Sequence, residues 1–296
     1  MIQRLPGVLI LLFYLPVAQS QPIDTLRGDL ELLASIPDAR HLAADAEGKL
    51  YVVTEREIVL LESDGQEQFR LGGSGIDDGA FEEVLDIDPG TGLVWAVADA
   101  GSGRVMRFSR TLLHLESLFV PPASYHGKPV RASREDPRDD EWQDTGRPIA
   151  VAVSLGGELF AIEEDTRRVL KWDASRRFER IIGGFDAAIG QLQEPISLAA
   201  DAEILYVADR GASAVLAFDY YGGYLRSYPA RSDVTDVWIA ESELWIVLRD
   251  AIWIYTEGDR RTRVLHFDLE APILAAVAVK PWIVLLTAGK LWRVNI

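Results

Sequence analysis

Four short apolar segments decide the fold of this chain: Glu194-Pro-Ile-Ser-Leu-Ala-Ala-Asp201, Ile204-Leu-Tyr-Val-Ala-Asp209, Ala214-Val-Leu-Ala-Phe-Asp219 and Gly223-Tyr-Leu-Arg-Ser-Tyr228. Each segment is rich in β-branched, aliphatic or aromatic residues and is bounded by turn residues, which is typical of strands. No apolar stripe recurs at helical spacing, and Gly or Pro interrupts the chain repeatedly. The stretch therefore predicts four consecutive β-strands.

The same pattern recurs in six copies along the chain. The second strand of each copy holds an aromatic residue, namely Tyr51, Trp95, Phe160, Tyr206, Trp245 and Trp282. The third strands are Ile58-Val-Leu-Leu61, Val105-Met-Arg-Phe108, Val169-Leu-Lys-Trp172, Val215-Leu-Ala-Phe218, Ile252-Trp-Ile-Tyr255 and Leu291-Trp-Arg-Val294, spaced by 47, 64, 46, 37 and 39 residues. Repeats of about 40–45 residues with four strands each are typical of propellers. The sequence predicts an all-β, six-bladed β-propeller.

The ends of the repeat array predict how the ring closes. The last copy stops after its third strand, whereas a spare apolar segment, residues 29–36, precedes the first copy. Pairing residues 29–36 with 290–295 would complete the last blade and remove two exposed sheet edges. We therefore expect one propeller domain over residues 29–296, with an insertion at 117–147 between blades 2 and 3.

The N-terminal residues have the pattern of an export signal. A basic start at Arg4 precedes a short apolar run, and Ala18-Gln-Ser20 supplies small residues before a cleavage site. The apolar run is too short to span a bilayer. We expect a signal peptide at residues 1–20, a leader at 21–28, no membrane span after cleavage, and a periplasmic or secreted protein.

Composition excludes several classes of protein. The 296 residues include 46 acidic and 30 basic side chains and no cysteine, for a net charge of −16. A hydrophobic fraction of 48 % argues against disorder, and the missing cysteines exclude a disulfide scaffold and thiol chemistry. The acidic balance argues against nucleic acid as a partner and favours a basic protein face or a small cationic ligand.

Several motifs resemble those of the NHL-repeat family of six-bladed propellers. They are Gly190-Gln-Leu-Gln-Glu-Pro195, Leu205-Tyr-Val-Ala-Asp209, and Val215-Leu-Ala-Phe-Asp219 followed by Gly222-Gly223, with weaker echoes at Gly72-Gly-Ser-Gly75, Gly79-Ala-Phe81, Val97-Ala-Asp99 and Arg104-Val105. The resemblance implies that the first strand of each blade lines a central channel. It also implies that loops after the second strand share one rim with the loops between blades, and that this rim carries the ligand.

That rim supplies the first set of candidate binding residues. The loops after the second strands contain Glu55, Arg56, Asp99, Glu164, Asp165, Asp209, Arg210, Arg249 and Asp250. They could form a charged recognition ring, but Asp in a tight turn also accepts local backbone N–H groups, which is a structural role. The structural role is the commoner one for each residue taken singly.

The insertion supplies the second set. Loops longer than about 12–15 residues are usually functional or disordered. Residues 117–147 are highly charged in their second half, yet they hold Tyr125, His126 and Trp142. We expect this loop to cap the channel mouth, with Trp142 as an anchor for a partner.

Signatures of catalysis and of cofactors are sparse. His41, His114 and His266 fall in strand-like segments and are interpreted as packed or surface residues, and no two histidines stand at metal spacing. Asp86 and Asp88, or Asp77 and Asp78, could bind a calcium ion weakly, but no EF-type loop is present. Calcium is therefore the disfavoured alternative, and no metal or other cofactor is expected. Five tryptophans concentrate near the C-terminus, where packing between blades is favoured over a sugar-binding platform: Trp238, Trp245, Trp253, Trp282 and Trp292.

Two functions remain open from the sequence. The leading one is a protein- or ligand-binding scaffold in the cell envelope or outside the cell, with a channel lined by aliphatic residues at Ala43, Ala44, Val151, Val153, Ala199, Ala200, Ala276 and Val277. The alternative is a lactonase-like hydrolase or a lyase that uses acids at the channel mouth, such as Asp99, Glu164 and Asp209, with a divalent metal. We assign no catalytic residue from sequence.

Overall fold

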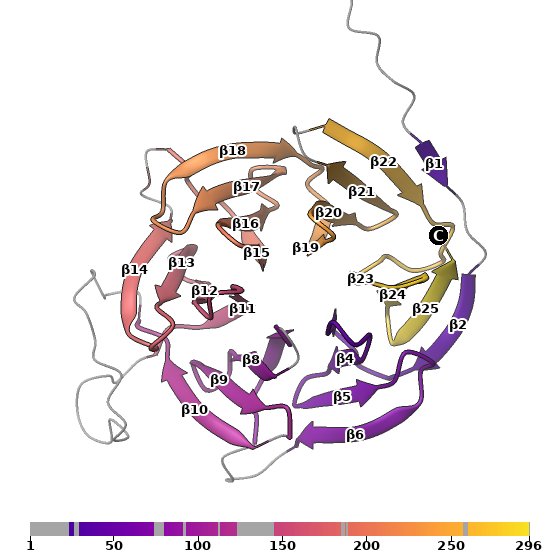
Figure 1. Ribbon diagram of the computed structural model, residues 1–296, viewed down its shortest axis with the longest axis horizontal. Coiled ribbons are helices and arrows are strands. Elements are labelled where there is room, and N and C mark those ends of the chain that lie inside the picture. The colour runs from indigo at the N-terminus through magenta and orange to yellow at the C-terminus, as the bar shows by residue number, and fades with distance from the viewer. Residues whose placement is uncertain are drawn as a thin grey trace, which may run out of the picture.

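Six sheets stand in a ring around a central axis (Figure 1). Five of them have four strands and one has five. The computed structural model describes residues 24–26, 30–73, 80–90, 93–111, 113–122, 145–184, 187, 189–256 and 260–295. Over these residues the chain is all β, with no helix. The predicted six-bladed β-propeller is confirmed.

Each of the first five blades is built from consecutive antiparallel strands that run from the axis outward. Blade 1 contains β3 (His41–Ala44), β4 (Leu50–Val53), β5 (Glu57–Leu61) and β6 (Glu67–Gly72), and blade 2 contains β7 (Val84–Asp88), β8 (Val94–Asp99), β9 (Arg104–Ser109) and β10 (His114–Phe119). Blade 3 contains β11 (Pro148–Val153), β12 (Leu159–Glu163), β13 (Arg168–Trp172) and β14 (Phe178–Gly183). Blade 4 contains β15 (Pro195–Ala200), β16 (Ile204–Asp209), β17 (Ala214–Asp219) and β18 (Tyr224–Pro229), and blade 5 contains β19 (Val234–Ala240), β20 (Glu243–Leu248), β21 (Ala251–Thr256) and β22 (Arg260–His266).

The sixth blade joins the two ends of the described chain. It contains β23 (Ala275–Val279), β24 (Trp282–Thr287) and β25 (Lys290–Asn295), and its outer strand is β2 (Leu30–Ser35). β2 pairs antiparallel with β25, from Leu30 opposite Val294 to Ser35 opposite Lys290, as the sequence predicted. A further short strand, β1 (Asp24–Leu26), pairs parallel with β22 and adds a fifth strand to blade 5. The segment that closes the ring therefore touches two neighbouring blades (Figure 1).

The hydrophobic core is divided among the six junctions between blades. Each of six buried clusters combines apolar side chains from two adjacent blades, and the cluster between blades 6 and 1 is one of them. Aromatic residues of the second strands lie in these clusters, with Tyr51, Trp95 and Phe160 almost fully buried. Stacking of blades, rather than a single central core, therefore holds the ring together.

The innermost strand of each blade is an edge strand that faces the channel. β7, β11, β15 and β19 each contain a register shift between their first and third residues, as at Pro195 and Ser197 of β15. An edge strand leaves backbone N–H groups without a ladder partner, and such groups need side-chain or solvent acceptors. Side chains on the innermost strands meet this need in part.

Candidate functional site

A cavity of about 1270 Å³ occupies the channel and opens at one face of the ring. We call it the channel cavity. Its wall is formed by the first strands and by the turns that follow them, at Ala46, Gly90, Leu155, Ala202 and Pro281. All eight aliphatic residues predicted to line the channel do so. The cavity therefore opens at the turns between first and second strands, opposite the rim that the sequence pointed to.

Four polar side chains interrupt this aliphatic wall at one repeat position. His41, Asp86, Ser197 and Asp236 each pair with the penultimate or final residue of the neighbouring second strand, at Val53, Ala98, Ala208 and Val247. The same position is Ala150 in blade 3 and Ala275 in blade 6. The four side chains come from four different blades, so they lie around one channel only because the blades close into a ring.

Asp86 and Asp88 connect blade 2 to blades 1 and 3. Asp86 lies 2.8 Å from Nε2 of His41 and accepts the backbone N–H of Val151 at 2.7 Å. Asp88 accepts the backbone N–H groups of Val153 at 2.7 Å and Gly90 at 2.6 Å. The two carboxylates thus satisfy edge-strand donors of blade 3 while their charges remain beside the cavity.

The electrostatics of this wall shift two acids and one base. Burial opposes the charged form of His41, but the adjacent Asp86, with Asp236 and Asp88, raises the pKa of His41 to about 9. Burial raises the pKa of Asp88 to about 6, although its backbone donors oppose the shift. This pKa favours the protonated form of His41 near neutral pH. His41 lies part-buried in β3, a strand segment as the sequence indicated, and its place in the cavity wall is an addition to that interpretation.

Asp236 is the carboxylate with the most capacity left for a ligand. Its Oδ1 accepts the hydroxyl of Ser197 at 2.6 Å and the backbone N–H of Val237 at 2.8 Å. Among the described residues, no hydrogen-bond donor reaches Oδ2. The side chain is 4 % exposed, and burial raises the pKa of Asp236 to about 6 despite the opposing charge of His41. A carboxylate oxygen without a partner is thus held at the cavity wall.

An aromatic wall adjoins Asp236 on blade 5. Trp238 lies two residues further along β19 and pairs with Trp245 of β20, and their ring centroids are 4.7 Å apart. Trp245 is 3 % exposed, and neither indole nitrogen has a hydrogen-bond partner within the described structure. Both tryptophans line the cavity, together with Arg263 of β22. The packing role predicted for Trp245 is confirmed. The sequence did not predict that both tryptophans also line the cavity.

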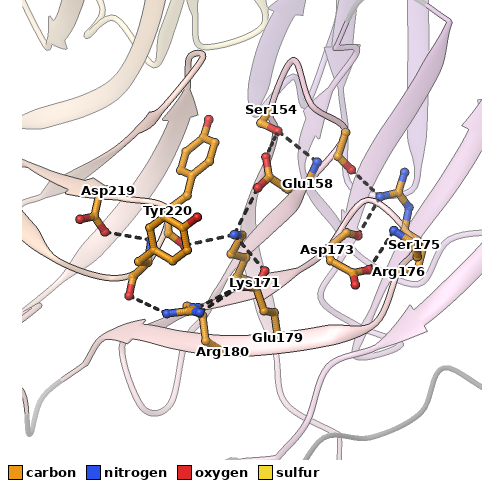
Figure 2. A network of polar contacts seen from close by, with 12 residues as sticks. Ser154, Glu158, Lys171, Asp173, Ser175, Arg176, Glu179, Arg180, Asp219 and Tyr220 are labelled. Atoms are coloured by element: carbon orange, nitrogen blue, oxygen red, sulfur yellow. Dashed lines mark hydrogen bonds and ion pairs between the residues drawn. The ribbon is translucent and has the colours of Figure 1, made fainter.

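A buried lysine braces the cavity mouth between blades 3 and 4 (Figure 2). Lys171 is 3 % exposed and forms ion pairs with Glu158 at 3.2 Å and Glu179 at 2.9 Å. Its ammonium group also donates to the carbonyl of Tyr220 in blade 4 at 3.1 Å. Ser154, which lines the cavity, donates to Glu158 at 2.7 Å. This network holds one side of the mouth in a fixed geometry.

The opposite rim contains the acids predicted from the turns, and two of them are fully buried. Asp99 accepts the backbone N–H of Glu83 at 2.9 Å, and Asp209 accepts those of Gln193 at 2.6 Å and Glu194 at 2.9 Å. Blade 3 uses Glu163 at this position, which accepts the backbone N–H of Asp165 and which the sequence analysis did not single out. These acids hold the turns together, which is the structural role considered above.

The remaining rim charges are exposed and largely paired with one another. Arg40 bridges Glu55 and Glu83, and Arg147 bridges Glu83 and Glu164, so one chain of ion pairs crosses blades 1 to 3. In blades 4 and 5, Arg210 donates to the carbonyl of Val234 and Asp250 pairs with Arg231. Arg56, Asp165 and Arg249 lie exposed in the turns of blades 1, 3 and 5. None of the rim residues predicted as binding lines the channel cavity. Their role in recognition stays a prediction.

The insertion between blades 2 and 3 has a closed neck. β10 extends to Phe119, so the connection spans residues 120–147 rather than the predicted 117–147. Gly146 donates its N–H to the carbonyl of Val120 at 2.9 Å, and Arg168 donates to the carbonyl of Pro122 at 3.0 Å. Tyr125, His126 and Trp142, like the signal peptide at 1–20, lie outside the described residues.

Two absences hold for the part of the chain that the structure describes. It contains no group of three or more His, Asp or Glu placed to hold a metal ion. It also contains no helix long and apolar enough to cross a membrane.

Comparison with known proteins identifies the fold class of this chain but no protein family to which it belongs. No family model matches the chain, and no curated protein matches it. Among solved structures, the streptogramin B lyase is similar with a TM-score of 0.61 and 11 % identity, covering 90 % of this chain and 97 % of that one. A gluconolactonase from Xanthomonas campestris, XC5397, has a TM-score of 0.64 and 12 % identity over 90 % of this chain and 89 % of its own.

The similar structures also include a protein of another kind. U3-55K has a TM-score of 0.65 and 12 % identity, covering 90 % of this chain and 98 % of that one. At such identities the likeness establishes the propeller fold alone, and propellers carry many unrelated functions. The function must therefore be argued from the site.

Proposed function

We propose that this chain is an exported, NHL-like β-propeller that acts as a binding scaffold in the cell envelope or outside the cell, and that its channel cavity binds a small cationic ligand. One observation carries the proposal. Asp86 and Asp88 from blade 2 and Asp236 from blade 5 line one cavity in which His41 is their shared cationic neighbour. A concave pocket with a few converging polar groups is the usual form of a small-molecule site.

The net charge of the protein supports the same choice of ligand. A chain with a formal charge of −16 attracts cations over long range, and a channel with apolar walls focuses that field. Asp88 is held by backbone donors and Asp236 by a hydroxyl and a backbone donor. His41 supplies one positive charge against the three carboxylates, and an ammonium group would offset part of the negative charge that remains.

The proposal is tested by titration of the intact protein with n-butylamine and, as the anionic counterpart, butyrate. We expect the amine to bind and butyrate to be rejected, and Asp236→Asn to weaken the amine by about tenfold because a charge-assisted contact is lost. Asp250→Asn, on the opposite rim, is the matched control and leaves binding unchanged. Equal affinity of wild type and Asp236→Asn, or binding sensitive to Asp250 alone, contradicts the proposal.

A second candidate function is acid–base catalysis in the same cavity. The observation that favours it is His41, which lies 2.8 Å from Asp86 and has a pKa raised to about 9, in a cavity that Asp236, with a pKa of about 6, also lines. An acid and a base with separated pKa values in one cavity suit a hydrolase or lyase. Turnover of lactone or ester substrates by the same preparation, abolished in His41→Asn, would favour this candidate over binding alone.

A further inference from the structure

We infer that the ligand of the channel cavity carries a carboxylate as well as its ammonium group, and that Arg107 and Arg176 hold this carboxylate between blades 2 and 3. The inference rests on the proposed function and narrows its ligand from an amine to an amino acid. It is carried by the two arginines, which line the cavity and share a single acidic partner. We call them the arginine pair.

The first step is the position of the arginine pair. Arg107 lies on β9 of blade 2, and Arg176 lies in the turn between β13 and β14 of blade 3. Both line the channel cavity, and their side chains are 15 % and 12 % exposed. Leu93, just before β8, and Leu155, just after β11, line the same cavity and are 63 % and 75 % exposed. The cavity is therefore open to solvent at these two blades.

The second step is the charge balance. Arg107 pairs with Oε1 of Glu116 on β10, and Nε of Arg176 lies 3.4 Å from the same oxygen. By contrast, Arg70 and Arg231 each pair with two carboxylates. Two guanidinium groups thus share one carboxylate in a chain that has 46 acidic and 30 basic side chains. The arginine pair and Glu116 together keep one positive charge.

The third step is the hydrogen-bonding capacity of the arginine pair. A guanidinium group has five N–H donors. Arg176 donates through Nη1 to the carbonyls of Gly157 and Asp173 (Figure 2), and its buried Nε has no hydrogen-bond partner among the described residues. Arg107 donates through Nη1 to Glu116, which is its one acceptor within the same part of the chain. Both groups therefore have donors left for an acceptor from outside the protein.

The fourth step selects a carboxylate as that acceptor. Burial and the charge of Arg107 lower the pKa of Arg176, although Glu116 and Asp173 oppose the shift. Asp173 is already bound through Oδ1 to two backbone N–H groups of its own turn. A further anion would relieve the repulsion between the arginines, and a planar carboxylate matches the guanidinium fork. A single negative charge balances the pair, whereas a doubly charged phosphate would be repelled by Glu116 and Asp173.

The fifth step sets the length of the ligand. Arg107 pairs with Ala96 of β8, and Ala96 pairs with Asp88 of β7. Paired residues on neighbouring strands project from the same face, so Asp88 and Arg107 both face blade 3, with backbones about 10 Å apart across two strand spacings. Asp236 lies on blade 5, at the opposite side of the ring (Figure 1). The two charges of the ligand are therefore several carbon atoms apart, as in an ω-amino acid.

The experiment is calorimetric titration of the full chain with 6-aminohexanoate, its neutral isostere 6-aminohexanamide, hexanoate and glycine. We expect 6-aminohexanoate to bind about three- to tenfold more tightly than the amide, because only the acid gains a charge-assisted contact. Hexanoate, which lacks the ammonium group, and glycine, which is too short, should bind at least tenfold more weakly than 6-aminohexanoate.

Variants test the arginine pair directly. Arg107→Gln should remove the advantage of the acid over the amide and change the affinity for the amide less than twofold. Glu116→Gln removes the competing carboxylate and should raise the affinity for 6-aminohexanoate about two- to fivefold, a gain that partial unfolding cannot produce. Arg70→Gln makes the same change at an exposed arginine outside the cavity lining and should alter neither affinity. Urea unfolding of each variant confirms that it is folded.

The outcomes separate this inference from the proposed function. If the amide binds as tightly as the acid, or if Arg107→Gln weakens both equally, the carboxylate subsite is overturned and the proposed function stands. Glycine binding as tightly as 6-aminohexanoate overturns the ω-amino acid. Absence of binding by both amines, or hexanoate binding as tightly as 6-aminohexanoate, overturns the inference and the proposed function together.

Discussion

At the scale of single residues, the channel cavity shows how structural and binding roles share a side chain. Asp86 and Asp88 satisfy backbone donors of β11, which an innermost edge strand cannot satisfy for itself. The cost is that carboxylates are buried beside an apolar channel, where the charged form is disfavoured. Asp236 has the same cost with one oxygen left unpartnered. The contribution of Asp236 to the free energy of unfolding therefore reports how strongly the cavity wall disfavours a charged carboxylate.

The pH dependence of stability tests this view of Asp236. Its folded pKa of about 6 exceeds the ordinary value of 3.8, so its protonation favours the folded state below about pH 4, and that contribution is lost as pH rises through 6. Asp236→Asn keeps an acceptor for Ser197 and Val237 but cannot ionise. Relative to wild type, the variant should gain on the order of 2–3 kcal/mol between pH 4 and pH 7.

Urea unfolding at pH 4, 5, 6 and 7 measures this difference, since urea is neutral and does not compete for a cation site. Asp64→Asn makes the same chemical change at an exposed turn and is the control. His41 has its own window, because its folded pKa is raised. Its favourable contribution is complete below about pH 6.5 and is lost as pH rises through about 9. A constant difference between wild type and Asp236→Asn across the acid range contradicts the argument.

At the scale of elements, the sequence predicted strands better than it predicted the site. The segments expected at 204–209 and 214–219 coincide with β16 and β17, because alternation, β-branched residues and turn residues are local signals. His41, Asp86, Ser197 and Asp236 lie in four blades, and no local motif joins them. A signal did exist, since each is a polar residue at the same repeat position of an otherwise apolar first strand. Aligning the first strands by their partners, rather than searching for spacing motifs, would have found it.

The neck of the insertion gives a prediction for a whole segment. Because Gly146 and Val120 are already joined by a hydrogen bond, replacing residues 123–144 by a short glycine linker should leave the blades intact. Loop-closure entropy then favours the shorter chain by about 1–2 kcal/mol. Thermal and urea unfolding check the stability, and amine titration checks that the cavity, at the opposite face, is unaffected.

Gly146→Ala is the matched variant for this prediction. A Cβ at that position would lie 2.4 Å from the carbonyl oxygen of Pro121, so the neck must open. We expect a loss of about 1–3 kcal/mol, the range for a strained or overpacked position. If the deletion unfolds the protein while Gly146→Ala is neutral, the neck does not hold the two blades. If the deleted protein keeps every binding activity, that result would also contradict the prediction that Trp142 anchors a partner.

At the scale of the whole molecule, ring closure was predictable and the extra strand was not. Residues 29–36 are an apolar strand without a partner in sequence order, and the sixth blade lacked one strand, so their pairing followed from counting. β1 has only three residues and pairs with blade 5 through its backbone, for which composition gives no signal. The closing segment thus contacts blade 6 through β2 and blade 5 through β1, on both sides of one junction between blades.

This arrangement predicts an unequal effect of two N-terminal truncations. A chain starting at residue 28 loses β1 but keeps β2, whose Leu30 and Leu33 pack against the clusters on either side of blade 6. A chain starting at residue 37 loses both strands and leaves β25 as an exposed edge, with those clusters uncovered. The first truncation should unfold in one cooperative transition close to that of the parent chain. The second should lose at least about 3 kcal/mol of unfolding free energy, the cost of exposing two or more core side chains.

Urea unfolding followed by circular dichroism measures the stability of both chains. A synthetic peptide of residues 29–36 should restore part of the loss in the second chain, because it re-forms the β2–β25 pairing. Equal stability of the two truncated chains, or no response to the peptide, would show that the ring is held by blade stacking alone and that closure by β2 is dispensable.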